Sequence, residues 1–246
     1  MNAIEAEGVT KAFEIPHASR RTVRGALLGY FRPLPRERLQ VLDGVSLEVR
    51  QGEALGIMGR NGCGKSTLLK ILSGIYAADA GAVRVRTHVT PVLELGVGWN
   101  PELDAVDNIL LLGTVMGLSL AEARAAVDRV LDFAELSRFA NLELKHYSSG
   151  MASRLAYAVA FLSVRETLIL DEIFAVGDAG FRARCEEHFR KLRAAGHTVV
   201  LVSHTADYVE RFCDRALLIE GGKVAREGGG AEVARAYLEL TRPAAP

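Results

Sequence analysis

The chain has 246 residues, of which 49% are hydrophobic and 24% charged, and its 30 basic and 30 acidic side chains give a formal net charge of zero. This composition allows one large α/β domain or two small ones with an ample core, and it excludes disordered and collagen-like chains. A neutral total does not suit a protein that coats nucleic acid, so we expect no nucleic-acid partner, although a local basic patch is compatible with it.

Three widely spaced cysteines, Cys63, Cys185 and Cys213, predict neither a disulfide framework nor a CxxC metal site. The N-terminal residues lack the basic start and apolar core of a signal peptide. The longest apolar stretches, Ile109 to Leu120 and Leu155 to Val164, are shorter than the roughly 20 residues that span a bilayer. We therefore expect a reduced, cytoplasmic setting, in which another polypeptide supplies any membrane span.

Near the N-terminus, a basic insertion from about 16 to 39 separates Phe13 from the strand-like run QVLDGVSLEV. Its six Arg and one Glu between His17 and Arg38 give a local charge of +5. Apolar residues with helical spacing predict one apolar helix face, formed by Val23, Leu27, Tyr30 and Phe31. Such a helix can lie on an anionic membrane surface or bind phosphate groups, and the alternative is a solvated basic loop that packs on its own domain.

The next motif lies where strand-like ALGIM meets helical STLLKILSG, and it matches the phosphate-binding pattern G-x-x-x-x-G-K-[ST]. Its residues are Gly59, Arg60, Asn61, Gly62, Cys63, Gly64, Lys65 and Ser66. We expect Lys65 to reach the β- and γ-phosphates of a nucleotide, Ser66 to bind Mg²⁺ and Thr67 to add a hydroxyl group. The structural alternative is a glycine-rich turn. Cys63 suits a small-residue position of that turn, and the alternative is a redox-sensitive thiol at a helix N-terminus.

Between Ala105 and Arg154 the pattern is helical without strands, and Ser119 and Glu122 have capping-box spacing. The remaining runs alternate between strand and helix, which predicts a mainly parallel sheet flanked by helices. After the last strand-like run, RALLIE, we expect only the connection GGKVAREGGG and a helix from Ala231 to about 240. The chain therefore reads as one domain, 1–246, with a helical subdomain at about 95–155.

An acidic pair, Asp171 and Glu172, ends the apolar run TLILD. In phosphate-loop enzymes, a carboxylate at such a strand end holds Mg²⁺, which we expect of Asp171. The second carboxylate is then the candidate general base that activates water, which we expect of Glu172. Two solvated acids at a strand end are the structural alternative.

With these motifs in this order, the chain resembles the ATP-binding cassette ATPases over essentially its whole length. The sequence YSSGM, from Tyr147 to Met151, lies where that family has its signature LSGGQ. His204 matches the switch histidine, Asp178 lies in the D-loop, and Phe13 lies where an aromatic ring stacks on adenine. The resemblance implies an α/β fold, the P-loop NTPase fold of ABC type: a RecA-like mixed sheet, an inserted helical subdomain and a small N-terminal antiparallel β portion.

Each of these matches also has a structural reading. Ser148, with Ser149 and Gly150, begins the helical run MASRLAYAVAF, and serine is a preferred N-cap, so capping and function coincide there. Isolated histidines at strand ends and isolated phenylalanines are often structural. The family's Q-loop glutamine is missing from Val92 to Leu103, where Glu94 is the nearest polar candidate for sensing Mg²⁺ or water.

The segments LELGVGWNPEL, YSSGM and DEIFAVGD resemble one branch of the family, the ATPases that power export of lipid-linked polysaccharides such as O-antigens, capsules and teichoic acids. That resemblance implies a homodimer with two bound ATP molecules and Mg²⁺, in which Glu172 and His204 carry out hydrolysis. It also implies two copies of an integral-membrane permease, a location on the cytoplasmic face of the inner membrane and a gate-like helix in the basic insertion. The carbohydrate-binding domain that some O-antigen exporters add is not expected here.

Other functions fit parts of the pattern. A cassette transporter of a lipid or a drug would share the nucleotide motifs. A soluble cassette ATPase acting on DNA or ribosomes would also share them, but such chains usually hold two cassettes or long coiled-coil insertions. A small-molecule kinase would have no need of the YSSGM sequence.

Overall fold

The computed structural model describes residues 1–16, 36–93, 95–174 and 177–242. The predicted helix face from Val23 to Phe31 and the candidate Glu94 lie outside these ranges. The ends of the insertion predicted at 16–39 are described, and they belong to a hairpin of β1 (Asn2–Pro16) and β2 (Arg36–Arg50). Antiparallel pairing therefore continues farther along this hairpin than the sequence pattern predicts.

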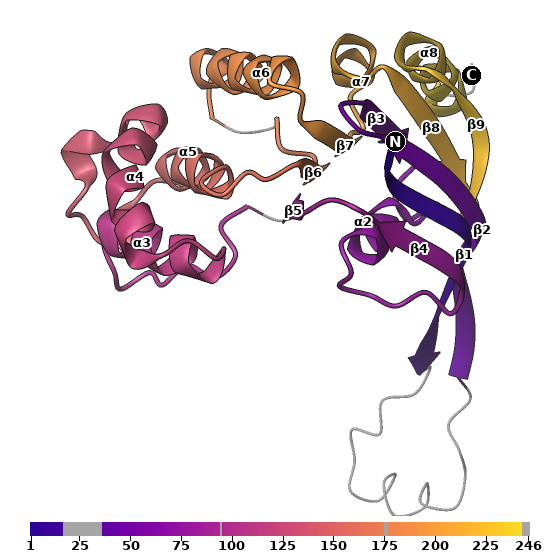
Figure 1. The fold of residues 1–246 in the computed structure, drawn as a ribbon, viewed down its shortest axis with the longest axis horizontal. Coiled ribbons are helices and arrows are strands. Elements are labelled where there is room, and N and C mark those ends of the chain that lie inside the picture. Colours follow the sequence, from indigo (N-terminus) through magenta and orange to yellow (C-terminus); the bar gives the residue numbers. More distant parts are fainter. Residues whose placement is uncertain (17–35, 94, 175–176, 243–246) are drawn as a thin grey trace, which may run out of the picture.

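A six-stranded sheet forms the centre of the molecule (Figure 1). Its order is β5-β6-β7-β3-β8-β9, and all neighbouring pairs are parallel except β8 with β9. Asp171 pairs with Val202, which pairs with Ile57, so the carboxyl ends of β6, β7 and β3 lie side by side. The strands are β3 (Ala54–Met58), β5 (Val89–Val92), β6 (Thr167–Asp171), β7 (Thr198–Val202), β8 (Arg215–Glu220) and β9 (Lys223–Gly229).

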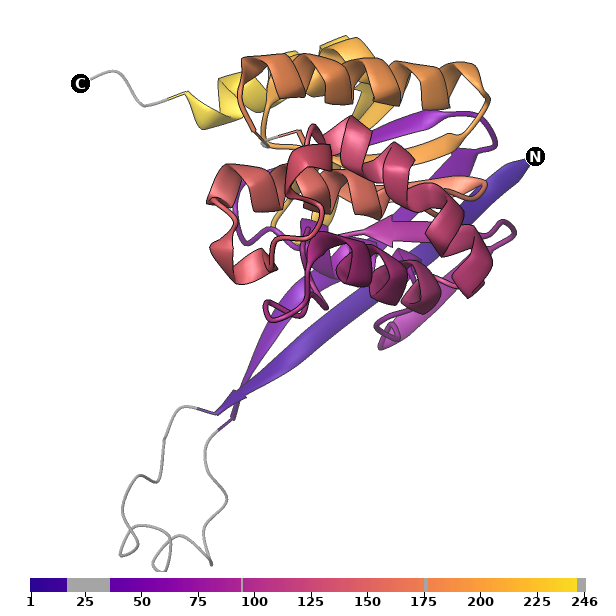
Figure 2. The ribbon, with the colours of Figure 1, turned by 90° about the vertical axis from the view of Figure 1, so that its left-hand side faces the viewer.

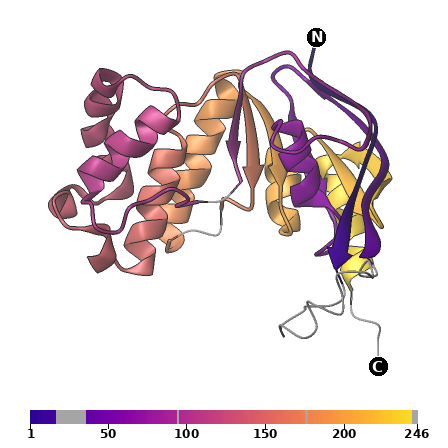
Figure 3. The same ribbon diagram turned by 90° about the horizontal axis from the view of Figure 1, so that it is seen from below.

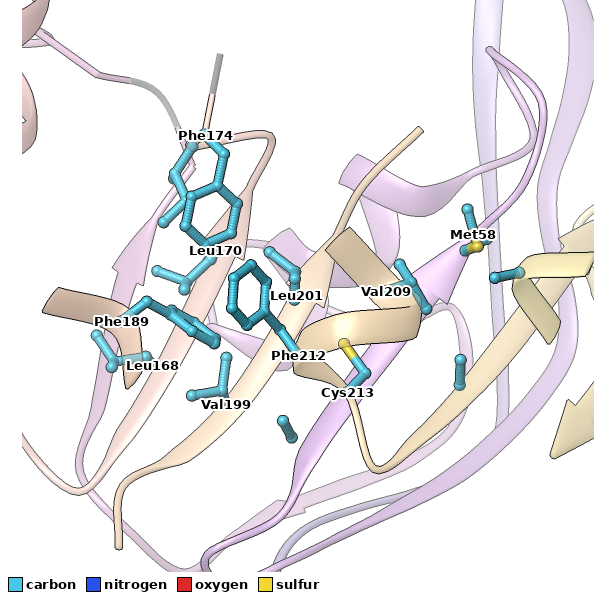
Figure 4. Packing of buried hydrophobic residues seen from close by; sticks show 14 of the residues in the cluster. Met58, Leu168, Leu170, Phe174, Phe189, Val199, Leu201, Val209, Phe212 and Cys213 are labelled. Carbon is cyan, nitrogen blue, oxygen red and sulfur yellow. The ribbon is translucent and has the colours of Figure 1, made fainter. Parts of the chain in front are cut away.

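Helices cover both faces of this sheet, and side chains alternate between two cores. In β6, Leu168 and Leu170 belong to one core, whereas Ile169 belongs to the other. Figure 4 shows the first core, where Leu168 and Leu170 lie near Phe189 and Phe212. Because both faces are covered, strands such as β3 and β7 are buried along their whole length. The covering helices are α2 (Lys65–Leu72), α6 (Ala179–Ala194), α7 (Ala206–Phe212) and α8 (Gly230–Thr241).

A smaller antiparallel sheet of order β2-β1-β4 lies beyond α2, which contacts β2, β4 and β6. The last strand, β4 (Ala80–Val85), pairs with β1 only between Ile4 and Thr10. The far ends of β1 and β2 therefore project as a two-stranded ribbon (Figure 2). This arrangement confirms the predicted fold class, a mixed sheet with an antiparallel β portion at the N-terminus.

Three helices form a separate lobe beside the sheet (Figures 1 and 3). They are α3 (Ala105–Val115), α4 (Leu120–Ala134) and α5 (Ser149–Ala160), and short 3-10 turns at Ser137–Phe139 and Leu144–His146 lie between the last two. The predicted capping box is present, because Ser119 Oγ accepts from the Glu122 N–H at 3.2 Å and the Glu122 carboxylate accepts from the Ser119 N–H at 2.7 Å. None of the helices in the described ranges is long and apolar enough to cross a bilayer.

One predicted connection is wrong. The chain after Glu220 returns as β9, antiparallel to β8. Gly221 and Gly222 have φ values of 55° and 77°, the two positive values that a two-residue type I′ turn requires. The charged and glycine-rich sequence KVAREGG lacks the apolar pattern that predicts a strand, because β9 is an exposed edge strand whose side chains need not be apolar.

Candidate functional site

The glycine-rich loop joins β3 to α2, with Gly64 as N-cap and Lys65 as the first helical residue. Two glycines are required by close backbone approaches. A Cβ atom at Gly59 would lie 2.3 Å from the carbonyl oxygen of Ile219, and one at Gly64 would lie 2.7 Å from that of Val41. Gly64 also has a φ of 105°, which favours glycine. The loop therefore packs against β8 and β2 more closely than side chains would allow.

The Lys65 side chain is buried within this loop, with only 7% of the residue exposed. Its Nζ donates hydrogen bonds to the carbonyl oxygens of Gly59 at 2.8 Å and Arg60 at 3.1 Å. An ammonium group has three donors, so one remains for a further acceptor. Its place at the start of a helix adds to the positive potential there, which suits a phosphate group.

Asp171, at the end of β6, accepts a hydrogen bond from Ser66 Oγ at 2.9 Å. Burial raises the pKa of Asp171 above its ordinary value, and the neighbouring Glu172 raises it further, while the Ser66 hydrogen bond opposes this. Mg²⁺ takes oxygen ligands and usually keeps only one or two from protein, with water and phosphate oxygens completing its shell. Ser66 and Asp171 fit that requirement, and the described residues offer no larger cluster of metal-binding side chains.

Glu172 follows Asp171 with a φ of 51°, which is uncommon for a residue other than glycine. Its N–H donates to the carbonyl oxygen of Val202 at 3.1 Å. Its Oε1 lies 2.8 Å from Nδ1 of His204, which follows β7, and both side chains are partly exposed. A carboxylate that is oriented by an imidazole and open to water can accept a proton from a water molecule.

A cavity of about 440 Å³ opens at the carboxyl ends of β3 and β6. Val41 of β2 and Leu93 also line it, and no motif marks either residue in the sequence. Leu93 directly precedes Glu94, which is outside the described ranges. The cavity brings together most of the predicted phosphate and metal residues, namely Asn61, Gly62, Gly64, Lys65, Ser66, Thr67, Asp171 and Glu172.

Four of the five YSSGM residues, Ser148 to Met151, line a second cavity of about 610 Å³ and do not line the first. Ser148, Ser149 and Gly150 are all exposed there. Ser148 is the N-cap of α5, and its Oγ accepts from the Met151 N–H at 3.2 Å. Within one chain, the phosphate loop and the YSSGM sequence therefore belong to different surfaces.

Two other predicted residues lie away from the phosphate cavity. Phe13, on β1, packs edge-on against Tyr76 with 5.9 Å between ring centroids, and Lys11 lies over its ring at 5.7 Å. Asp178 is the N-cap of α6 and accepts from the Phe181 N–H at 2.9 Å. That hydrogen bond, followed by one from an arginine of α5, lowers the pKa of Asp178.

Comparison with known proteins decides the family. Residues 42–175 match the model of the ABC transporter domain. The chain belongs to the ABC transporter family. This cassette is 39% identical, over 97% of its length, to an O-antigen export system ATP-binding protein of Myxococcus xanthus, but it spans only 56% of that relative. It is 38% identical to an O-antigen export system ATP-binding protein of Klebsiella pneumoniae, with 82% of each chain covered.

A solved structure of an ATP-binding cassette supports this family assignment. The cassette superposes on a dimeric ATP-binding cassette in a post-hydrolysis state bound to ADP and Pi, with a TM-score of 0.73 and 25% identity. The match covers 92% of this chain and 98% of that one. The predicted ABC-type fold is therefore confirmed, and its carboxyl-end cavity lies where α/β sheets of this kind usually bind ligands.

Proposed function

We propose that this chain is the ATP-hydrolysing subunit that powers export of a lipid-linked polysaccharide through a separate membrane permease. The convergence of Lys65, Ser66, Asp171 and Glu172 on one cavity carries the ATPase part of the proposal. The similarity to O-antigen export proteins over 97% of the chain supports the cargo class. The location that follows is the cytoplasmic face of the inner membrane, beside two permease copies.

In the proposed mechanism, Lys65 binds oxygens of the β- and γ-phosphates. Ser66 and Asp171 would hold Mg²⁺, which would supply positive charge to offset that of the phosphates. Glu172, which His204 orients, takes a proton from water as the water oxygen forms a bond to the γ-phosphorus. The bond from that phosphorus to the bridging oxygen breaks, and the electron pair leaves with ADP. General-base catalysis of this kind contributes about 10²–10⁴-fold.

The separation of the two cavities supports a homodimer with two ATP molecules between its subunits. Each copy presents a phosphate loop on one surface and exposed Ser148 to Gly150 on another. In a symmetric head-to-tail pair, the phosphate loop of each copy would lie against the N-terminus of α5 in the other copy. Helix N-termini attract anions such as phosphate groups. Glu94 and Phe13 would complete this site as Q-loop and adenine contacts.

Mixing two inactive variants tests this dimer. Lys65→Met disables the phosphate loop, and Ser148→Arg blocks the YSSGM surface, so each variant alone should hydrolyse little ATP. A mixture should regain about a quarter of wild-type activity, because half of random pairs join unlike chains and each such pair has one intact site. A mixture as inactive as its components would contradict the shared site.

The cargo requires a cellular test. In the source cell, Glu172→Gln should leave lipid-linked polymer inside and remove it from the surface, while the variant protein co-purifies with a multispanning membrane protein. Normal surface polysaccharide with altered efflux of a lipid or drug would favour another cargo. Absence of any membrane partner would favour a soluble cassette ATPase.

A further inference from the structure

Four charged residues outside the phosphate cavity connect the helices α4, α5 and α6. Arg154 of α5 binds Glu135 with Nη1 at 2.6 Å and Asp178 with Nη2. Glu135 also accepts from Arg184 of α6, at 3.1 Å between Oε1 and Nη1. We call Glu135, Arg154, Asp178 and Arg184 the clasp.

Each carboxylate of the clasp lies at a helix end with a constrained backbone. Glu135 is the C-cap of α4, in a left-handed conformation with a φ of 60°. Asp178 is the N-cap of α6 and is held by the Phe181 N–H. The Arg154 guanidinium lies 5.2 Å from the centroid of the Phe181 ring, and only 20% of its side chain is exposed. A single planar guanidinium therefore spans two chain segments whose backbones are already fixed.

The clasp lies directly beside the YSSGM surface. Glu135, Arg154 and Asp178 line the same 610 Å³ cavity as Ser148 and Gly150. Arg154 is on the helix that Ser148 caps, whereas Asp178 begins a helix that packs on the central sheet. The contact of Arg154 with Asp178 thus connects the helical lobe to a helix of the central sheet at the edge of this cavity, while its contact with Glu135 stays within the lobe.

Folding stability does not explain this arrangement. The side chains of Glu135 and Asp178 are 52% and 63% exposed, and ion pairs with exposed partners add little to stability. The geometry points instead to orientation, because a guanidinium can bind two carboxylates at once from its two Nη atoms, which an ammonium does less specifically.

We propose that Arg154 is a positioning residue, whose clasp fixes the N-terminus of α5 against that of α6 so that Ser148 and Gly150 meet the nucleotide of a second copy in one geometry. This inference rests on the shared site in the proposed function. It predicts that loss of the clasp weakens dimer closure and hydrolysis while ATP binding to the phosphate loop of one copy is unchanged.

The test uses the Glu172→Gln chain, in which ATP should accumulate in a closed dimer, and measures dimerisation with ATP by light scattering. Adding Arg154→Met should raise the protein concentration for half-dimerisation at least about tenfold, since orientation errors of this kind reduce productive association. Arg154→Lys should give a partial effect. With Glu172 intact, Arg154→Met should lower kcat, while the affinity of the monomer for ATP stays at the wild-type value.

Arg190→Met is the matched control. Like Arg154, Arg190 of α6 contacts two carboxylates and an aromatic ring. It pairs with Glu186 and Glu187 and lies 5.7 Å from the Phe212 ring, but it does not line the cavity. This variant should dimerise and hydrolyse ATP as the wild type does.

If Arg154→Met does not fold, Glu135→Gln tests whether the clasp affects dimerisation. This variant keeps the side-chain shape and removes the charge that both arginines contact. It should weaken dimerisation, and combined with Arg154→Met it should add little further loss. A Glu172→Gln parent that stays monomeric with ATP would overturn the shared site and, with it, this inference. A parent that dimerises, together with clasp variants that dimerise equally well, would overturn the role of the clasp alone.

Discussion

The two surfaces that bear the nucleotide motifs are built differently. The phosphate loop is embedded in the sheet: Lys65 is buried, Gly59 and Gly64 contact neighbouring backbone, and Ser66 binds Asp171. The YSSGM surface is open, since Ser148 to Gly150 are exposed and supported by one N-cap and by the clasp. One surface is preorganised by packing within a chain, whereas the other depends on helix orientation.

This difference indicates where substitutions act. A change in the phosphate loop should alter chemistry directly, because its side chains already have fixed partners. A change at the YSSGM surface should alter the assembly of the site from two copies. Substitutions at Lys65, Glu172, Ser148 and Asp171 should separate these two kinds of effect.

Lys65→Met should have the largest effect. It removes the buried ammonium that we propose binds phosphate oxygens, and we expect kcat/KM for ATP to fall about 10³-fold, the upper loss for a preorganised electrostatic donor. Phosphate-release kinetics measure this loss. Lys223→Met is a control, since Lys223 is the exposed first residue of β9 and pairs with Asp43. Hydrolysis by Lys65→Met near the wild-type rate would show that the loop does not hold the phosphates.

Glu172→Gln should lower kcat about 10²-fold, because the amide cannot accept the proton from water. ATP affinity, measured by calorimetry, should stay near that of the wild type, since the Glu172 side chain contacts the His204 imidazole at the solvent-exposed edge of the site. His204→Ala should cause a smaller loss, because the carboxylate itself remains. Near-normal turnover by Glu172→Gln would assign the base elsewhere.

Ser148→Ala and Ser119→Ala compare two N-caps in one lobe. Each should cost about 1 kcal/mol of unfolding free energy in denaturant titrations, the usual value for a lost serine cap. Only Ser148→Ala should also reduce ATPase activity, most strongly at low protein concentration, because only Ser148 lies on the YSSGM surface. Equal ATPase losses in the two variants would reduce the role of Ser148 to capping.

Asp171→Asn should change the free energy of unfolding only slightly, and it should raise this free energy at neutral pH, whereas the two cap substitutions lower it. Since burial raises the pKa of Asp171, its folded-state carboxyl keeps a proton to higher pH than the unfolded one. The contribution of Asp171 to stability is therefore complete below the ordinary pKa of 3.8 and is lost as the pH rises through the folded-state value.

At pH 7, Asp171→Asn should therefore raise the Tm of the nucleotide-free protein, and the difference from the wild type should shrink as the pH falls toward 3.8. Mg²⁺-dependent hydrolysis should be lost in the same variant. A lower Tm than that of the wild type at pH 7 would show that the Ser66 hydrogen bond outweighs burial.

Local chemistry explains which structural expectations are confirmed. The capping box of Ser119 and Glu122 involves groups three residues apart, so the sequence alone specifies it. The N-cap at Ser148 is equally local. The strand β9 is missed because its stability comes from pairing with β8 and from two glycines with positive φ, not from an apolar pattern.

Contacts between distant segments cannot be predicted from local sequence patterns. Val41 lines the phosphate cavity only because β2 passes the loop at a distance that Gly64 permits. The clasp joins Arg154 to Glu135 and Asp178 across three helices, and no spacing rule relates those positions. The left-handed conformations of Glu135 and Glu172 are likewise set by their surroundings.

By itself, the sequence determined the α/β class, the family and the order of the nucleotide motifs, because glycine spacing, strand-end carboxylates and capping patterns are encoded within a few residues of one another. Only the tertiary structure placed the phosphate loop and the YSSGM sequence on separate cavities and connected the latter to the sheet through Arg154. The physical reason is that strand order and helix packing bring together residues far apart in the chain. A local sequence pattern does not specify which distant residues become neighbours.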